Sequence, residues 1–124
     1  MPIKLQISAP DRMVIGVATG DLTAQDLDHF LAEIAAASAF RYRKIIDVMS
    51  ATPALTAEEL MAFSKRVFAV LPRQGSGPLA IVTNEANSPL ARLFAQLTEQ
   101  DRPAGVFRSI REAREWLYAN SRIT

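Results

Sequence analysis

The sequence predicts a single α/β domain, a mixed sheet of four to five strands with flanking helices in the order ββαβαβαβα. Short apolar runs that fit strands alternate with longer segments whose apolar residues recur at helical spacing. Strands joined through a helix need crossover connections and are expected to pair in parallel. A length of 124 residues fits one domain, so we expect residues 1–124 to form one unit.

The first three elements are two strands and a helix. Residues 3–8 alternate apolar and polar side chains, and residues 12–19 follow as a second, more buried strand. The turn between them, Ala9-Pro10-Asp11, is too short for a crossover, so we predict an antiparallel hairpin. Thr23-Ala24-Gln25-Asp26 has the pattern of a capping box and opens a helix predicted over 24–38.

The middle of the chain adds a strand and a second helix. The apolar run at 45–49 predicts a third strand that ends near Asp47, with a loop over 50–55 after it. Thr56-Ala57-Glu58-Glu59 is a second capping box. The helix that it opens is predicted over 57–71 and stops before a proline.

Two further strand–helix pairs complete the order. The apolar run at 79–83 predicts a fourth strand, and Ser88-Pro89 begins a third helix with the serine as its N-cap residue. A short fifth strand is predicted over 105–108. The capping box Ser109-Ile110-Arg111-Glu112 then opens the last helix.

Charge and composition argue against several function classes. Fourteen Lys and Arg residues against thirteen Asp and Glu give a net charge of +1, which does not fit a dedicated nucleic-acid binder. Without cysteine and with a single histidine, His29, we expect no metal site and no cofactor. Gly75-Ser76-Gly77 follows a helix and precedes a strand, which is the wrong context for a phosphate-binding loop. No apolar run approaches the roughly 20 residues of a membrane span, and we expect a cytoplasmic protein.

The candidate ligand-binding residues follow the predicted strands. In open α/β sheets, ligands bind beyond the carboxyl ends of the strands, where the strand order switches. Three predicted loops lie there, after the second, third and fourth strands. Their polar residues are Asp21, Asp47, Ser50, Thr52, Thr83, Asn84 and Glu85.

Asp47 stands out in this group, because a carboxylate at the end of an apolar strand is costly unless it is paired or functional. Two interpretations stay open. Asp47 is either a site residue or a buried partner of Arg43, Lys44 or a backbone amide. We predict a carboxylate that is largely buried and hydrogen-bonded. Asp21, by contrast, also fits a simple turn residue.

The helix predicted over 57–71 has more apolar surface than packing on a sheet requires. Its apolar side chains span roughly 180° of arc, whereas one-sided packing needs a stripe of about 100°. Met61 and Phe68, one heptad apart, lie on the flank of this stripe. The sequence therefore predicts an isologous homodimer through this helix. The alternative is a monomer whose helix lifts to admit an apolar ligand.

Several segments together resemble the SpoIIAA-like family of small bacterial proteins. They are Val17-Ala18-Thr19-Gly20-Asp21-Leu22-Thr23, Tyr42-Arg43-Lys44-Ile45-Ile46-Asp47, Gly77-Pro78-Leu79-Ala80-Ile81-Val82 and Val106-Phe107-Arg108-Ser109, with Glu112-Ala113 and Trp116-Leu117 near the end. That family is related to STAS domains, the anti-sigma factor antagonists, and in fold to the lipid-binding SEC14 domains. The resemblance implies a mixed sheet of four or five strands with flanking helices.

The resemblance also implies a candidate phosphorylation site. STAS antagonists carry a phosphorylatable serine two residues after an aspartate at the end of the third strand. Asp47 matches that aspartate, but position 49 is Met49, and the serine stands one residue later as Ser50. No glycine follows it, and the helix begins only after Thr56. Ser50 is the candidate acceptor.

Two classes of function remain. The first is a non-enzymatic regulatory or binding module that docks a protein partner or a small apolar or anionic ligand at the strand carboxyl ends. The second is a small enzyme that uses Asp47, Asn84 and Glu85. No nucleophile paired with a base is evident in the sequence, so no catalytic residue is assigned and the binding module is favoured.

Overall fold

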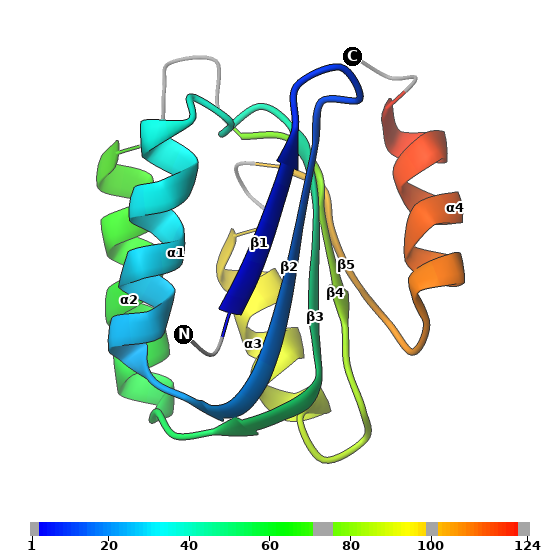
Figure 1. The fold of residues 1–124 in the computed structure, drawn as a ribbon. Helices are drawn as coiled ribbons and strands as arrows, with labels where there is room; N and C mark the ends of the chain where they lie inside the picture. Colours follow the sequence, from blue (N-terminus) through cyan, green and yellow to red (C-terminus); the bar gives the residue numbers. More distant parts are fainter. Residues whose placement is uncertain (1–2, 71–75, 99–101, 122–124) are drawn as a thin grey trace.

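The structure, a computed structural model, describes residues 3–70, 76–98 and 102–121. It has five strands and four helices in the predicted order (Figure 1). The elements are β1 (Ile3–Ser8), β2 (Met13–Leu22), α1 (Ala24–Ala36), β3 (Arg43–Pro53), α2 (Ala57–Val70), β4 (Leu79–Val82), α3 (Ser88–Thr98), β5 (Ala104–Phe107) and α4 (Ile110–Ser121).

The five strands form one mixed sheet in the order β1-β2-β3-β4-β5. β1 and β2 pair antiparallel and every other neighbouring pair is parallel, which confirms both the predicted hairpin and the predicted crossovers. Right-handed crossovers that all advance in the same direction place their helices on the same face of a sheet. Accordingly α1, α2 and α3 cover one face and α4 covers the other (Figure 1).

This strand order contradicts one premise of the sequence interpretation. The order follows the chain from one edge to the other and never reverses, so the sheet has no switch point. Ligands of open α/β sheets bind in a crevice at such a switch point, so this rule does not predict a ligand crevice in this fold.

The second and third strands are also longer than predicted. β2 continues past residue 19 to Leu22, and β3 continues past Asp47 to Pro53, so the predicted loop over 50–55 is wrong. The extra residues pair with one another, from Thr19 with Ser50 to Leu22 with Pro53, after a β-bulge that shifts the register. Residues that favour turns locally are held in strands here by parallel pairing.

Local signals located the helices well. Thr23 and Asp26 form the predicted capping box, and the backbone amide of Thr56 donates to Glu59 while the amide of Glu59 donates to the Thr56 hydroxyl. The Ser109 hydroxyl accepts from the amide of Glu112 at the start of α4. α1 ends at Ala36, two residues earlier than predicted, and Leu71, the predicted end of the second helix, lies outside the described residues.

The core has a separate cluster on each part of the sheet. Val14, Phe30 and Ile34 belong to the cluster between α1 and the hairpin, and Leu79 with Ala91 belongs to the cluster beneath α3. The third cluster lies beneath α4 on the opposite face. α2 differs from the other helices, because its backbone lies close to α1 and α3, whereas α1, α3 and α4 each lie close to a strand.

Candidate functional site

An apolar cavity of about 120 Å³ lies between the sheet and the three helices α1, α2 and α3. Its walls are almost entirely hydrocarbon. The apolar side chains that line it include Phe30 and Ile34 from α1, Leu60, Phe63 and Val67 from α2, Leu90, Ala91 and Phe94 from α3, and Ile46, Val48 and Ile81 from the sheet.

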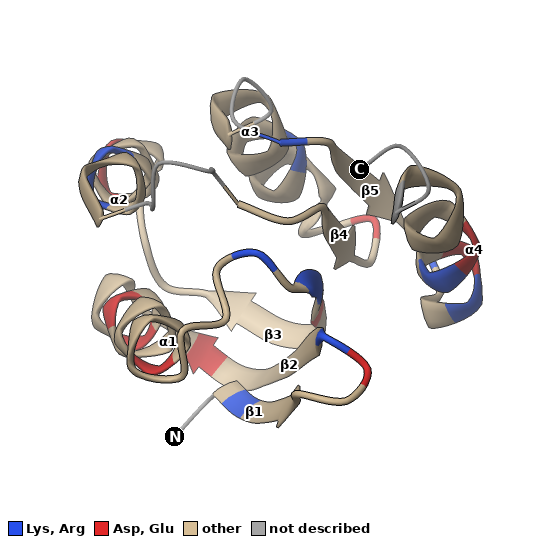
Figure 2. Ribbon diagram, turned by 90° about the horizontal axis from the view of Figure 1, so that it is seen from above, with Lys and Arg blue, Asp and Glu red and all other residues tan. Residues whose placement is uncertain are grey.

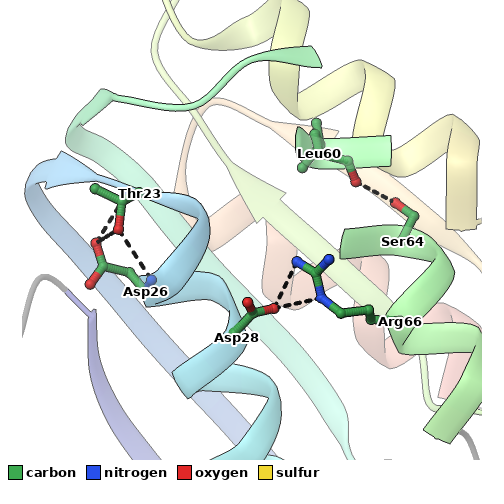
Figure 3. Close-up of polar contacts among 6 residues, drawn as sticks. All are labelled: Thr23, Asp26, Asp28, Leu60, Ser64 and Arg66. Carbon is green, nitrogen blue, oxygen red and sulfur yellow. Dashed lines mark hydrogen bonds and ion pairs between the residues drawn. The ribbon is translucent and has the colours of Figure 1, made fainter. Parts of the chain in front are cut away.

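The cavity exists because α2 stands on its neighbouring helices. Phe63 of α2 stacks on Phe94 of α3 with ring centroids 5.8 Å apart. On the other side, Arg66 of α2 reaches Asp28 of α1 with an ion pair of 2.9 Å (Figure 3). The Ser64 hydroxyl donates to the Leu60 carbonyl within α2, so its polar group is satisfied inside the helix (Figure 3). These contacts hold α2 as a roof above the sheet.

Two buried cations line one end of the cavity. Lys44 is 4% exposed and Arg102 is 6% exposed, and both belong to the cavity wall. The Lys44 ammonium donates to the carbonyls of Phe40 and Tyr42 and to the Ser76 hydroxyl. Lys44 pairs with Leu79 at the start of β4, and Leu79 pairs with Ala104 at the start of β5. Because Arg102 precedes Ala104 by two residues, both cations lie toward the amino ends of the parallel strands.

Sequence reasoning did not assign these cations to a site. A signal for Lys44 was available, because strand alternation puts it on the same face as Ile46 and Val48, which point into the cavity. Arg102 precedes β5 in an irregular segment, where no periodicity indicates its direction.

Asp47 is hydrogen-bonded and shielded, as the sequence predicted. Its carboxylate accepts a hydrogen bond of 2.9 Å from the backbone amide of Met49, which confirms the predicted bond and selects the backbone-amide alternative. Asp47 is also partly buried and does not project freely into solvent, as predicted. The strand continues past it, and the bulge at Val48 and Met49 turns the chain so that the carboxylate closes a local turn.

Thr83 and Asn84 support the backbone at the carboxyl end of β4. Thr83 is fully buried and its hydroxyl donates to the Asn84 carbonyl at 3.0 Å. The Asn84 side-chain amide donates to the Met49 carbonyl at 2.8 Å, and its oxygen accepts from the amide of Asn87 at 2.7 Å. Both predicted site residues therefore hold the loop after β4 against the bulge in β3. Glu85 is exposed beside them.

Asn87 is the residue of this region that sequence reasoning missed. It is buried, and its side-chain amide donates to the carbonyls of both Val48 and Ala51 at 2.8 Å. Its own carbonyl accepts from the amide of Ala91, so Asn87 precedes the first turn of α3 in place of the predicted N-cap, Ser88. An asparagine just before a Ser-Pro helix start was the available signal.

Asp21, Ser50 and Thr52 come together at the exposed ends of β2 and β3. Thr19 pairs with Ser50 and Asp21 pairs with Thr52, and all four residues are exposed. Their side chains point away from the buried Leu22 and from the helices α1 to α3. The structure thus brings Asp21 close to Ser50, but in strands rather than in the predicted loops.

The predicted interface residues are exposed on α2. Met61 is 45% exposed and Phe68 is 40% exposed. Within the described ranges, no helix is long and apolar enough to cross a bilayer, and no cluster of three or more His, Cys, Asp or Glu side chains is placed to hold a metal ion.

The residues of the enzyme hypothesis do not form a reactive group together. Asp47 and Asn84 are both bonded to backbone groups, and only Glu85 of the three is without such a bond in the described residues. The arrangement at the carboxyl ends offers an exposed hydroxyl and carboxylates, whereas the cavity offers a partly open apolar volume with two buried basic side chains at one end.

Comparison with solved structures identifies the fold. The chain is similar to an uncharacterized protein of the DUF3478 family with a SpoIIAA-like fold from Shewanella loihica PV-4, with 20% identity, a TM-score of 0.61, and coverage of 93% of this chain and 91% of that one. It is also similar to the anti-sigma factor antagonist SpoIIAA in its unphosphorylated form, with 13% identity, a TM-score of 0.55, and coverage of 94% and 97%. No protein-family model and no curated protein matches the chain.

Proposed function

On the SpoIIAA-like fold that this chain has, we propose a non-enzymatic binding module whose ligand is a small apolar molecule with an anionic group. The observation that carries the proposal is the apolar cavity of about 120 Å³ beneath α2. We expected a ligand at the carboxyl ends of the strands, but the apolar cavity lies between the sheet and the helices instead.

A cavity of this size is costly unless something fills it. Protein interiors are close-packed, and side chains that line an unfilled space lack van der Waals contacts on that side. A ligand that occupies the space supplies those contacts. An apolar cavity of about 150 Å³ in another protein admits benzene, so the ligand part enclosed here has about six heavy atoms.

The charge of the cavity wall favours an anion at one end. Lys44 and Arg102 are both more than nine-tenths buried at that end of the cavity and both already have partners. An anionic group of the ligand would join this network as a further acceptor for their N–H groups. The combination of hydrocarbon walls and two cations fits an aromatic or short-chain carboxylate. A long acyl chain exceeds the volume unless α2 moves away from the sheet.

The test is a thermal-shift and calorimetric titration with benzoate, hexanoate, toluene and decanoate. We expect benzoate and hexanoate to raise Tm and bind with one site per chain, and toluene to bind more weakly. Ala91→Leu fills the cavity and should abolish binding, whereas Ala119→Leu on the exposed side of α4 should leave it unchanged. The proposal fails if none of the four compounds binds, or if Ala91→Leu binds them as well as the parent chain does.

The exposed Ser50 favours a second candidate function, a protein-docking surface switched by phosphorylation. The chain shares its fold with an anti-sigma factor antagonist whose structure is of the unphosphorylated form. Ser50 is exposed, near Asp21 across the strand pair. A phosphate there adds a charge of about −1.5 to −2 next to a carboxylate, and like-charge repulsion weakens the pairing of β2 with β3.

Intact-mass analysis of the protein isolated from its own host tests this candidate. The expected result is a species heavier by one phosphate group that disappears in Ser50→Ala and persists in Thr52→Ala. If neither the parent chain nor the Thr52→Ala variant carries phosphate, Ser50 is not an acceptor.

A further inference from the structure

Two arginines, with a third nearby, lie at the end of the molecule where the parallel strands begin. Arg12 lies in the turn between β1 and β2, and Arg41 and Arg43 lie where the chain enters β3. The amide of Arg43 donates to the Arg12 carbonyl at 3.1 Å, so the two segments are in contact. In Figure 2 the blue start of β3 lies beside the blue part of the turn between β1 and β2. We call Arg12 and Arg43 the arginine end, and Arg41 lies near it but toward Ala35 and Ser38.

Two of these guanidinium groups are held in place by aromatic rings. The Arg12 guanidinium carbon lies 5.2 Å from the ring centroid of Tyr42, and that of Arg43 lies 5.5 Å from the ring centroid of Tyr118. Arg43 also donates to the Asp11 carbonyl at 2.8 Å. Stacking of this kind orders a long side chain before any partner arrives, which lowers the entropy cost of binding.

The backbone at Arg12 adds a second observation. Its φ is +51°, in the left-handed region that glycine adopts without steric cost. The Arg12 amide donates to the Ala9 carbonyl at 3.2 Å, so Arg12 closes a tight turn at a position where glycine or asparagine is the usual choice. An arginine at such a position is explained by its side chain rather than by the turn.

The charge of the arginine end is not balanced locally. Across residues 3–70, 76–98 and 102–121, no Asp or Glu forms an ion pair with Arg12, Arg41 or Arg43. The nearest carboxylate in sequence, Asp11, accepts from the Ser8 hydroxyl at 3.1 Å. Arg12 and Arg41 are exposed and Arg43 is half-buried, so the positive charge faces solvent.

We propose that the arginine end docks a glutamate- and aspartate-rich segment of a partner protein. Ordered guanidinium groups bind carboxylates in a defined geometry. A nucleic acid fits less well, because the two tyrosine rings that would stack on bases already face guanidinium groups, and the chain as a whole carries only +1. This docking surface is separate from the cavity and does not depend on the ligand proposed for it.

Fluorescence anisotropy with a labelled hexaglutamate peptide tests the proposal. We expect the intact protein to bind the peptide, with affinity that falls as salt rises. Arg12→Gly suits the turn and should weaken binding about threefold, and Arg12→Gly with Arg43→Ala should weaken it about tenfold. Arg108→Ala is the matched control, because Arg108 is exposed after β5 at the opposite end of the sheet.

The outcomes are distinct. Loss of affinity in the arginine-end variants, with the control unchanged and Tm retained in Arg12→Gly, supports the proposal. Equal loss in Arg108→Ala would show that the peptide senses only net charge and would overturn it. The proposal also fails if hexaglutamate does not bind at low salt, or if a thymidine oligonucleotide of equal charge binds more tightly and loses affinity in the same variants.

Discussion

The two faces of the sheet are covered in opposite ways. On one face α4 packs directly on the strands, and Ile45, Ala80, Val82, Ala113 and Leu117 are all essentially inaccessible to water. On the other face α2 rests on α1 and α3 and leaves a cavity above the sheet. The first face is built for close packing, and the second leaves room for another molecule.

Small side chains explain the close approach of α4. Ala113 of α4 and Ala80 of β4 belong to the same buried cluster, and a Cβ atom added to Gly105 would lie only 2.7 Å from the ring of Phe107, which itself contacts Trp116. On the opposite face, large side chains such as Phe63 and Phe94 meet each other and keep α2 away from the strands. The size of the residues between helix and sheet therefore decides which face is dense.

Truncation of a leucine on each face should show the largest difference. Leu117→Ala is expected to lower the free energy of unfolding by about 4 kcal/mol, because it opens a new cavity in a dense cluster. Leu60→Ala should cost about 2 kcal/mol, because Leu60 already borders a cavity and α2 has room to settle. Urea unfolding measures both free energies. Equal losses in the two variants would contradict the difference in packing between the two faces.

The asparagine that supports the cavity wall should have the next largest effect. Asn87→Ala leaves the carbonyls of Val48 and Ala51 without their donor in a buried site, which we expect to cost about 2 kcal/mol. Asn84→Ala, the matched control, exposes the Met49 carbonyl to water and should cost less than about 1 kcal/mol. If the two variants are equally stable in urea, Asn87 is not the support that the structure indicates.

The outer side of α2 tests whether the loosely packed face is covered by a second chain. We keep the prediction that Met61 and Phe68 mediate a homodimer, since burial of their exposed surface would contribute about 2 kcal/mol before the costs of association. Met61→Asp with Phe68→Asp should then halve the solution mass measured by light scattering. A parent chain that is already monomeric at micromolar concentration contradicts the dimer.

The ion pair between α1 and α2 should have the smallest effect on stability. Asp28→Asn removes the contact with Arg66, and because both side chains are nearly half-exposed the expected cost is below about 1 kcal/mol and shrinks further in high salt. The same change should speed ligand entry, since the pair joins two helices of the cavity roof. Stopped-flow binding of the cavity ligand measures that rate, with Glu33→Gln on α1 as the control.

The sequence was a good guide wherever neighbouring residues determine structure. The capping boxes at Thr23 and Thr56 depend on contacts within four residues, and both helices begin where those patterns predicted. The ends of β2 and β3 depend on each other instead. Gly20-Asp21 and Thr52-Pro53 favour turns in isolation and become strand residues through their pairing, which no local pattern reveals.

The candidate site was harder to predict for a related reason. The wide apolar arc of the second helix predicted a homodimer or a helix that lifts to admit a ligand. Met61 and Phe68 on that arc are exposed, and both alternatives stay predictions. The positions of Thr83 and Asn84 after an apolar strand drew attention to these polar residues but did not indicate their role. The same residue types support a backbone bulge in some proteins and bind a ligand in others. The distance of α2 from the strands is a property of the assembled fold alone.

The sequential strand order has a consequence for how the protein folds. Every strand of the sheet pairs with the strand next to it along the chain, so each new strand finds its partner already made. Each step after the hairpin closes one helix-containing crossover, such as the one that brings Arg43 beside Met13 or Ala104 beside Leu79, and no pairing joins strands that lie farther apart along the chain. During synthesis the sheet can extend from the β1–β2 hairpin one strand at a time, and α4 adds the cover of the second face at the end.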